Sequence, residues 1–561
     1  MSVDALLLLQ RSDVAAVRAH ADAWSGVPLV CIDPGLLDDA LAAGLDPERL
    51  DYRPLDVGPR FQSRLATEAM TRALRADQAL ARERERLWGD GAFDGWDHVP
   101  LRFLFLRAAI ARRLGELCAR AFPERRVGLL RPTVPAQFYF DSFVATDAFV
   151  QASDRFVVVD AYDEVEHRVA DASARCWDLD WIARHARDGA PAIVHVPTVW
   201  SHVRHYGAEL ARAFGRVIEL PSPLWDVPLW DGRCPMRPLA EADVPPQAQA
   251  YRERARATLA AHLADLGPGP GAVALQADAL ADQCRLQAVH YLGLRRALQG
   301  TRPHLVTTEH DTGAVGPLFS VAHAIGAGIT VLPHSSYPTQ PLPHPFRVVA
   351  VERDGFASTV RTVAGEPVRT RAFRLAPRPA PAPRPRVRSV CLLVNTMASR
   401  GISHIDFAGL VAFHRALADA CARHDARLQV RLKPGASCAA VVAPALGATA
   451  ASLQQALDAP IERLAAQVDL CVAYGELTSA AIEFMEAGAA VMHVSRERRP
   501  TDLVNASALS TMATLPTLDH EDAIARLEAL LGDPDAWRRA LDAQRAEYAA
   551  RLSARSERVF D

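Results

Sequence analysis

The chain has 561 residues, of which 50% are hydrophobic and 23% are charged. This composition is typical of a folded globular protein and excludes a largely disordered chain. The length exceeds what one hydrophobic core usually serves, so it predicts two large domains or several small ones. The net charge of −3 argues against a strongly basic surface, and we expect no nucleic-acid partner.

The basic residues are divided very unevenly between the two types. Of the 63 basic residues, only Lys433 is a lysine and all the others are arginine. A codon bias that exchanges Lys for Arg explains this trend. The surviving lysine is either a chance exception or a position where a compact ammonium cannot be replaced by a planar guanidinium.

Targeting signals and cysteine spacing indicate the compartment. No stretch approaches 18 continuous apolar residues, so no transmembrane helix is expected. The first residues, MSVDALLLLQRSD, predict a β-strand and not a signal peptide. The nine cysteines include no C-x-x-C pair, which favours a reducing compartment over a disulfide framework or a zinc site. We therefore expect a cytoplasmic protein without a metal or cofactor.

The first 375 residues alternate between apolar strands and helices. Strands are predicted at 5–10, 28–32, 156–160, 192–196, 216–220, 304–308 and 328–333. Helices are predicted at 58–88, 101–121 and 315–325, with one or two long helices over 246–300 that are split at GPGPG (267–271).

A proline-rich segment, APRPAPAPRPRVR at 376–388, predicts an extended linker. After it, strands are predicted at 388–396, 427–433, 468–473 and 490–494, and helices at 407–424, 461–467 and 479–487. Strands that alternate with helices indicate parallel sheets covered on both faces. We therefore predict an α/β fold of two Rossmann-like doubly wound domains facing each other across a cleft. These are an N-terminal domain (1–375) with extra helices and a C-terminal domain (389–535), followed by a C-terminal helix (536–561).

Three ionisable residues, Glu309, His310 and Asp311, follow the strand 304–308 directly. Ligands of doubly wound sheets bind at the carboxyl ends of the strands. A side chain there could take a proton from an attacking hydroxyl or stabilise a cationic sugar-like transition state. The alternative is that Asp311 or Thr312 only caps the next helix.

The next strand ends in His334, Ser335 and Ser336. An imidazole and two hydroxyls on a turn could bind an anion such as phosphate. The alternative is a turn whose hydroxyls satisfy backbone groups.

In the C-terminal domain the strand 427–433 ends in Arg431, Leu432 and Lys433 before a Pro-Gly turn. Alternation along the strand predicts Arg431 and Lys433 on the same side. The turn opens the backbone to a ligand. We interpret this strand end as a second phosphate-binding element.

A second motif of that domain lies at the junction of the strand 468–473 and the helix 479–487. Thr478 and Ser479 lie at the helix N-terminus, where free N–H groups favour phosphate. Glu483 follows one turn later and could accept hydrogen bonds from ribose hydroxyls. The alternative is a Thr/Ser cap with a solvated Glu.

Together these residues resemble the GT-B glycosyltransferases, most closely bacterial enzymes of surface-polysaccharide synthesis. R-x-K-P (431–434) and T-S-x-x-x-E-x-x-x-x-G (478–488) are similar to the donor-nucleotide site of that group. The H-S-S turn (334–336) is similar to phosphate-binding elements of CMP-sugar users, including sialyltransferases and Kdo transferases. Those families often have His-Gly and Lys-Pro-His-Pro where this chain has His-Ser and Lys-Pro-Gly-Ala. The resemblance covers roughly residues 300–500.

The resemblance implies a role for each motif. His334, Ser335, Ser336, Arg431, Lys433, Thr478 and Ser479 would hold the donor phosphate, and Glu483 the ribose. Asp311 or Glu309 would be the catalytic carboxylate, with His310 beside them, in an inverting or a retaining reaction. The resemblance further implies a metal-independent enzyme with a nucleotide-sugar donor and a glycan or glycolipid acceptor, which would bring it to the inner face of the membrane.

Two other functions remain open. A CDP-polyol phosphotransferase of the teichoic-acid type carries a related set of motifs, but would be expected to have a histidine beside Lys433. A non-catalytic sugar-nucleotide-binding scaffold would keep Lys433 and the helix after Thr478 and would not need the acids at 309–311.

Overall fold

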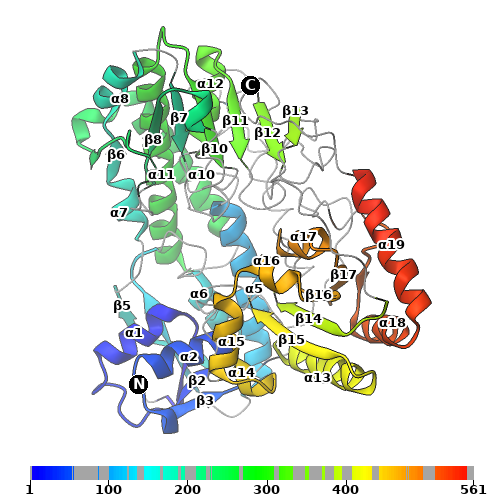
Figure 1. Cartoon of the computed structure of the whole chain (residues 1–561). Helices are drawn as coiled ribbons and strands as arrows, with labels where there is room; N and C mark the ends of the chain where they lie inside the picture. The colour runs from blue at the N-terminus through cyan, green and yellow to red at the C-terminus, as the bar shows by residue number, and fades with distance from the viewer. Residues whose placement is uncertain are drawn as a thin grey trace.

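The structure of the protein is a computed structural model (Figure 1). The structure describes residues 3–53, 100–122, 126–135, 144–163, 168–187, 191–195, 210–222, 230–264, 269–308, 315–332, 348–352, 369–372, 385–394, 407–432, 441–475, 479–496 and 512–551, and the single residues 55, 82, 86, 228, 477 and 509. Three parallel sheets organise this part of the chain. Figure 1 shows them in three separate parts of the molecule.

The first sheet has the order β3-β2-β1-β4-β5, and all its neighbouring strands are parallel. Buried apolar residues cover both of its faces. Its elements are β1 (Ala5–Leu8), α1 (Arg11–Ala19), β2 (Leu29–Cys31), α2 (Pro34–Ala42), β3 (Leu50–Tyr52), α5 (Pro100–Ala121), β4 (Val127–Pro132), α6 (Val144–Ala152) and β5 (Phe156–Tyr162).

The second sheet has the order β13-β12-β11-β10-β7-β8 and is also parallel throughout. Its strands are β7 (Ala192–His195), β8 (Val217–Leu220), β10 (His304–Thr308), β11 (Ile329–Leu332), β12 (Val348–Glu352) and β13 (Arg369–Ala372). Its helices are α7 (Val169–Ser173), α8 (Leu179–Ala186), α10 (Pro246–Ala264), α11 (Pro270–Ala297) and α12 (Val315–Ile325), and β6 (Arg175–Trp177) pairs with β9 (Met236–Pro238) beside them.

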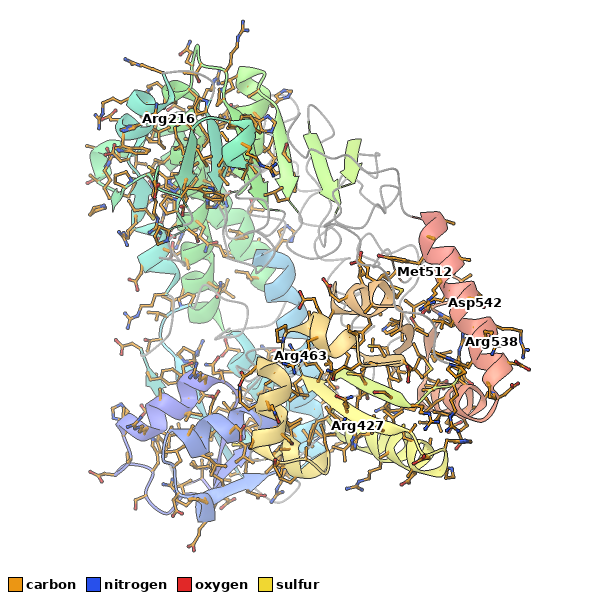
Figure 2. All side chains as sticks on the ribbon, viewed as in Figure 1. Arg216, Arg427, Arg463, Met512, Arg538 and Asp542 are labelled. Carbon is orange, nitrogen blue, oxygen red and sulfur yellow. The ribbon has the colours of Figure 1, made fainter. Side chains whose placement is uncertain are left out.

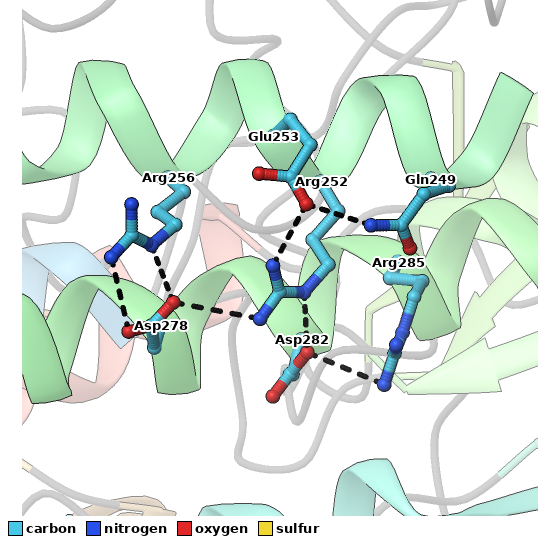
Figure 3. Close-up of polar contacts among 7 residues, drawn as sticks. All are labelled: Gln249, Arg252, Glu253, Arg256, Asp278, Asp282 and Arg285. Atoms are coloured by element: carbon cyan, nitrogen blue, oxygen red, sulfur yellow. Dashed lines mark hydrogen bonds and ion pairs between the residues drawn. The ribbon is translucent and has the colours of Figure 1, made fainter.

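The helices α10 and α11 lie side by side and are joined by a network of ion pairs (Figure 3). Arg252 of α10 contacts Asp282 of α11 at 2.7 Å and Asp278 at 3.5 Å. Arg256 also pairs with Asp278, and Arg285 pairs with Asp282. Partly exposed pairs such as these add little stability individually, and the buried apolar residues that the two helices share in one cluster supply most of their contact.

The third sheet has the order β15-β14-β16-β17-β18 and is again parallel. Two buried clusters fill its two faces. Its strands are β14 (Ser389–Val394), β15 (Arg427–Leu432), β16 (Leu470–Tyr474), β17 (Ala490–Val494) and β18 (Thr517–Leu518). Its helices are α13 (Phe407–Arg423), α14 (Val442–Ala445), α15 (Ala450–Asp458), α16 (Ile461–Ala465), α17 (Ser479–Glu486), α18 (His520–Gly532) and α19 (Pro534–Arg551).

The last helix, α19, is attached to the third sheet. Trp537, Leu541 and Tyr548 are buried, whereas Arg538 and Asp542, labelled in Figure 2, are exposed. The amide of Gln544 accepts from the Val491 N–H at 2.7 Å and donates to the Val491 carbonyl at 2.8 Å. The short strand β18 pairs only with His493 and Val494 of β17, so it does not reach Val491. Gln544 supplies the hydrogen bonds to Val491 that a longer strand would supply.

The α/β class with parallel sheets is confirmed, and the structure adds a division that the sequence did not indicate. Residues 1–375 contain two sheets, because the first ends at Tyr162 and the second begins at Ala192. The predicted helices at 101–121 and 315–325 are present, and the long segment after 246 is split at the glycines as expected. Most of the predicted helix at 58–88, and residues 376–384 of the linker, lie outside the described residues. Within the described residues, no helix is both long enough and apolar enough to cross a membrane.

Candidate functional site

The second and third sheets share one topology. When the strands of each sheet are numbered in chain order, their spatial order across the sheet is 2-1-3-4-5. The second sheet has a sixth strand after the fifth. In such sheets the strand order reverses between strands 1 and 3, and ligands bind outside the carboxyl ends at that switch point. The switch points therefore lie between β7 and β10 in the second sheet and between β14 and β16 in the third.

The predicted catalytic segment follows a strand at the switch point of the second sheet. Thr308, the last residue of β10, pairs with Leu332, the last residue of β11. The chain therefore leaves these two strands at neighbouring points, about 4.8 Å apart. The six predicted residues that come next, Glu309, His310, Asp311, His334, Ser335 and Ser336, lie outside the described residues.

The predicted donor-binding residues follow strands on either side of β14 in the third sheet. Val394 at the end of β14 pairs with Leu432 of β15 on one side and with Tyr474 of β16 on the other. The ends of β15 and β16 are therefore about 10 Å apart. Lys433 and Thr478 lie outside the described residues.

Arg431 is buried and contacts the end of helix α15. Its Nη1 donates to the carbonyl of Ala456 and, at 2.7 Å, to that of Ala459. A cation at these carbonyls satisfies helix groups that would otherwise lack partners. The structure thus gives Arg431 a helix-capping role, and its predicted role in phosphate binding stays a prediction.

The turn from β16 into α17 is held by backbone and side-chain hydrogen bonds. Gly475 has a φ of +88°, a conformation that favours glycine. Its N–H donates to the Val494 carbonyl at 2.9 Å, and its own carbonyl lies 2.7 Å from Nε2 of His493. Ser479 begins α17, and Glu483 is half-buried on the side of that helix away from its core residues.

In the first sheet, α1 follows β1 as α17 follows β16 in the third sheet, and the N-terminus of α1 carries an acidic side chain. The buried carboxylate of Asp13, in the first turn of α1, accepts from the N–H groups of Leu9 at 2.7 Å and Gln10 at 3.2 Å. The hydroxyl of Tyr162 donates to its other oxygen at 2.5 Å. Burial raises the pKa of Asp13 to about 7. This helix N-terminus is occupied by a carboxyl group and is a poor place for a phosphate.

Sequence reasoning missed a polar cluster in the core at the switch point of the second sheet. His195, the last residue of β7, pairs in register with Thr307 of β10. Trp177 stacks on His290 with 3.9 Å between ring centroids and meets His195 edge to face at 5.3 Å. The available signal was the lone histidine at the end of the apolar strand 192–195.

The hydrogen bonds of this cluster define its tautomers. Nδ1 of His195 lies 2.8 Å from the Leu220 carbonyl, so Nδ1 carries the proton and donates. The backbone N–H of Trp177 donates to Nε2 of His290 at 3.4 Å. Burial lowers the pKa of His195 to about 4 and that of His290 to about 3, so both rings are neutral at pH 7. Within the described part of the chain, the remaining ring nitrogens and the amide of buried Gln287 have no hydrogen-bond partner.

The fold and its sites define the class of protein as an α/β protein with three parallel sheets, two of them doubly wound with the same strand order. No protein-family profile matches the sequence. No curated protein matches it either.

Several solved structures are similar to the chain at low identity. The glycotransferase of kitacinnamycin is 14% identical with a TM-score of 0.36, and the match covers 65% of this chain and 96% of that one. The spinosyn rhamnosyltransferase SpnG complexed with thymidine diphosphate is 13% identical with a TM-score of 0.34, over 64% of this chain and 96% of that one. A UDP-glucosyltransferase from Polygonum tinctorium is 12% identical with a TM-score of 0.32, over 64% and 94%.

Proposed function

We propose that this chain is a glycosyltransferase that moves a sugar from a nucleotide donor to a glycan or glycolipid acceptor. The observation that carries the proposal is topological. The predicted catalytic segment at 309–311 follows β10, and the predicted donor loop at 475–479 follows β16. Each of these strands borders the switch point of its sheet. Two of the four sequence motifs thus follow strands that border a switch point, which supports the proposal.

In this proposal the third sheet binds the nucleotide. The N–H groups and dipole at the start of α17 would stabilise the leaving phosphate without a metal, together with basic and hydroxyl side chains. The residues assigned to the phosphate are Lys433, Thr478 and Ser479, which follow strands of the third sheet, and His334, Ser335 and Ser336, which follow β11 of the second sheet. Glu483, one turn into α17, would accept hydrogen bonds from the ribose hydroxyls.

The contrast with the first sheet supports this assignment. The N-terminus of α1 is filled by the Asp13 carboxyl group, which accepts from the backbone N–H groups of Leu9 and Gln10. A phosphate there would have to displace a buried acid. The first turn of α17, which begins at Ser479, carries no acidic residue. We therefore assign the donor to the third sheet.

The second sheet would supply the chemistry. A carboxylate at Asp311 or Glu309 would deprotonate the acceptor hydroxyl in an inverting reaction, or attack or stabilise the anomeric carbon in a retaining one. The resemblance of the H-S-S turn to CMP-sugar users favours a CMP-linked donor carrying Kdo or a sialic-acid-like sugar. A glycolipid acceptor would bring the enzyme to the inner face of the membrane.

A thermal-shift screen with CMP, CDP, UDP and GDP tests the proposal, with cytidine as the control that lacks a phosphate. A ligand at 100 times its Kd stabilises the native state by about 2.7 kcal/mol, which raises the melting temperature. We expect CMP to give the largest shift and cytidine little or none. A larger shift with another nucleotide would correct the donor, and no shift with any nucleotide would overturn the proposal.

A further inference from the structure

A histidine lies where the buried strand β17 would be expected to carry an aliphatic side chain. The strand reads AVMHV, and all five of its residues are buried. Alternation places His493 on the same face as Val491, which packs in the cluster that contains the core residues of α17. The imidazole therefore lies on the side of the sheet that α17 covers.

Both ring nitrogens of His493 are hydrogen-bonded. Nε2 lies 2.7 Å from the carbonyl oxygen of Gly475, and Nδ1 lies 2.9 Å from the hydroxyl oxygen of Thr517. Because a carbonyl can only accept, Nε2 carries the proton and donates to Gly475, and in this tautomer Nδ1 accepts from the Thr517 hydroxyl. The Gly475 carbonyl thus fixes the tautomer, and Thr517 helps to hold the orientation of the ring.

The residue that His493 contacts begins the loop into α17. The N–H of Gly475 is bonded to Val494, the chain neighbour of His493, so β17 holds Gly475 from both its amide and its carbonyl side. A glycine has no side chain that could fix its orientation, so these two hydrogen bonds help to hold Gly475 at its φ of +88°. Two residues later Leu477 is buried in the same core cluster. Gly475 and Leu477, which both precede α17, are therefore held by β17 and by the core, respectively.

We propose that His493 is a positioning residue for the donor-phosphate loop, acting through the Gly475 carbonyl. The inference rests on the proposed function, because it assumes that the loop at 475–479 binds the nucleotide. Loss of the Nε2 donor would leave the Gly475 peptide free to rotate. The N–H groups and hydroxyls that follow would then be misaligned, and nucleotide affinity would fall.

Two near-isosteric variants separate the two nitrogens of the ring. The side-chain amide of His493→Gln can reach the position of Nε2 and donate to Gly475. The shorter amide of His493→Asn reaches only the position of Nδ1, near Thr517. The control is His520→Asn, because His520 bonds Tyr474 at 3.0 Å near the same sheet edge and makes no described contact with Gly475.

The experiment measures nucleotide affinity by calorimetry and melting temperature for each variant, with the tightest-binding of CMP, CDP, UDP and GDP as probe. We expect His493→Asn to lose about tenfold in affinity and His493→Gln to stay within about twofold of the wild type. His520→Asn should lower the melting temperature and keep the affinity. If His493→Asn does not fold, Thr517→Val, which releases Nδ1 and loosens the ring, should show a smaller loss of affinity.

The outcomes distinguish the two proposals. Equal affinities for Asn and Gln variants, in a protein that loses nucleotide binding on Lys433→Ala, would overturn the positioning role and leave the proposed function intact. The same holds if Gln fails to rescue affinity, since the effect would then not depend on the Nε2 donor. Absence of nucleotide binding in the wild type would overturn both.

Discussion

The hydroxyl of Tyr162, at the end of β5, donates to the buried carboxyl of Asp13 in α1 over 2.5 Å. Backbone N–H groups of Leu9 and Gln10 bond the other oxygen of that carboxyl, and these bonds lower its pKa. Burial is nevertheless the largest cause and raises the pKa of Asp13 to about 7, while burial and the neighbouring Asp13 raise that of Tyr162. The first sheet therefore contains an acid that titrates near neutral pH.

Asp13 should make the protein less stable as the pH rises from about 4 to about 7. The folded protein holds the proton up to pH 7, whereas the unfolded chain releases it near 3.8, so the contribution is complete at low pH and lost at neutral pH. The change amounts to about 4 kcal/mol at most. Asp13→Asn stays neutral and should show no such decline. Thermal melts between pH 4 and 8 measure this, with the exposed Asp542→Asn as control. If the melting temperatures of the wild type and of Asp13→Asn change in parallel with pH, Asp13 is ionised in the folded protein throughout this range.

His195 should act in the opposite direction. Burial lowers its pKa from 6.5 to about 4, so its contribution is complete above pH 6.5 and is lost as the pH falls toward 4. The loss is about 3 kcal/mol. The amide of His195→Asn can keep the bond to the Leu220 carbonyl without titrating. We expect this variant to lose less stability than the wild type between pH 6.5 and 4 in the same melts. If the variant and the wild type lose the same stability between pH 6.5 and 4, the loss comes from groups other than His195.

The sequence predicted the strands that carry a continuous apolar run, and the site residues assigned to the ends of those strands stay predictions. The strands at 304–308 and 490–494 have the predicted limits. The sequence did not show that β1 to β5 form a sheet of their own, because strand pairing depends on contacts far apart in the chain. Nor did it indicate that Arg431 caps α15, since the acceptors are backbone carbonyls 25 and 28 residues away. The sequence shows that His493 and His195 lie in apolar strands, but it does not show which groups they contact. Their roles were therefore missed.

Substitution of Arg431 should lower the stability of the fold, whereas substitution of Lys433 should weaken nucleotide binding. Arg431→Ala removes the charged donor from two carbonyls at the end of α15, which should cost about 2 kcal/mol. Lys433→Ala should leave the melting temperature unchanged and weaken nucleotide binding about tenfold or more. Lys433→Arg should recover only part of that affinity, because a guanidinium does not replace an ammonium in a tight phosphate site. Melting curves and calorimetry on the three variants check this. Unchanged nucleotide affinity in Lys433→Ala would remove Lys433 from the donor site.

Asp311→Asn should abolish turnover and keep nucleotide binding. If Asp311 accepts the proton of the acceptor hydroxyl, the amide cannot replace it, and general-base catalysis of this kind contributes about 100-fold to 10,000-fold in rate. The measurement is release of nucleotide from the donor sugar identified in the thermal-shift screen, with calorimetry to show that the donor still binds. Glu309→Gln is the matched variant two residues away. A fully active Asp311→Asn beside an inactive Glu309→Gln would transfer the catalytic role to Glu309. Full activity in both variants would remove the 309–311 segment from the chemistry and leave a nucleotide-binding protein whose catalytic carboxylate lies elsewhere.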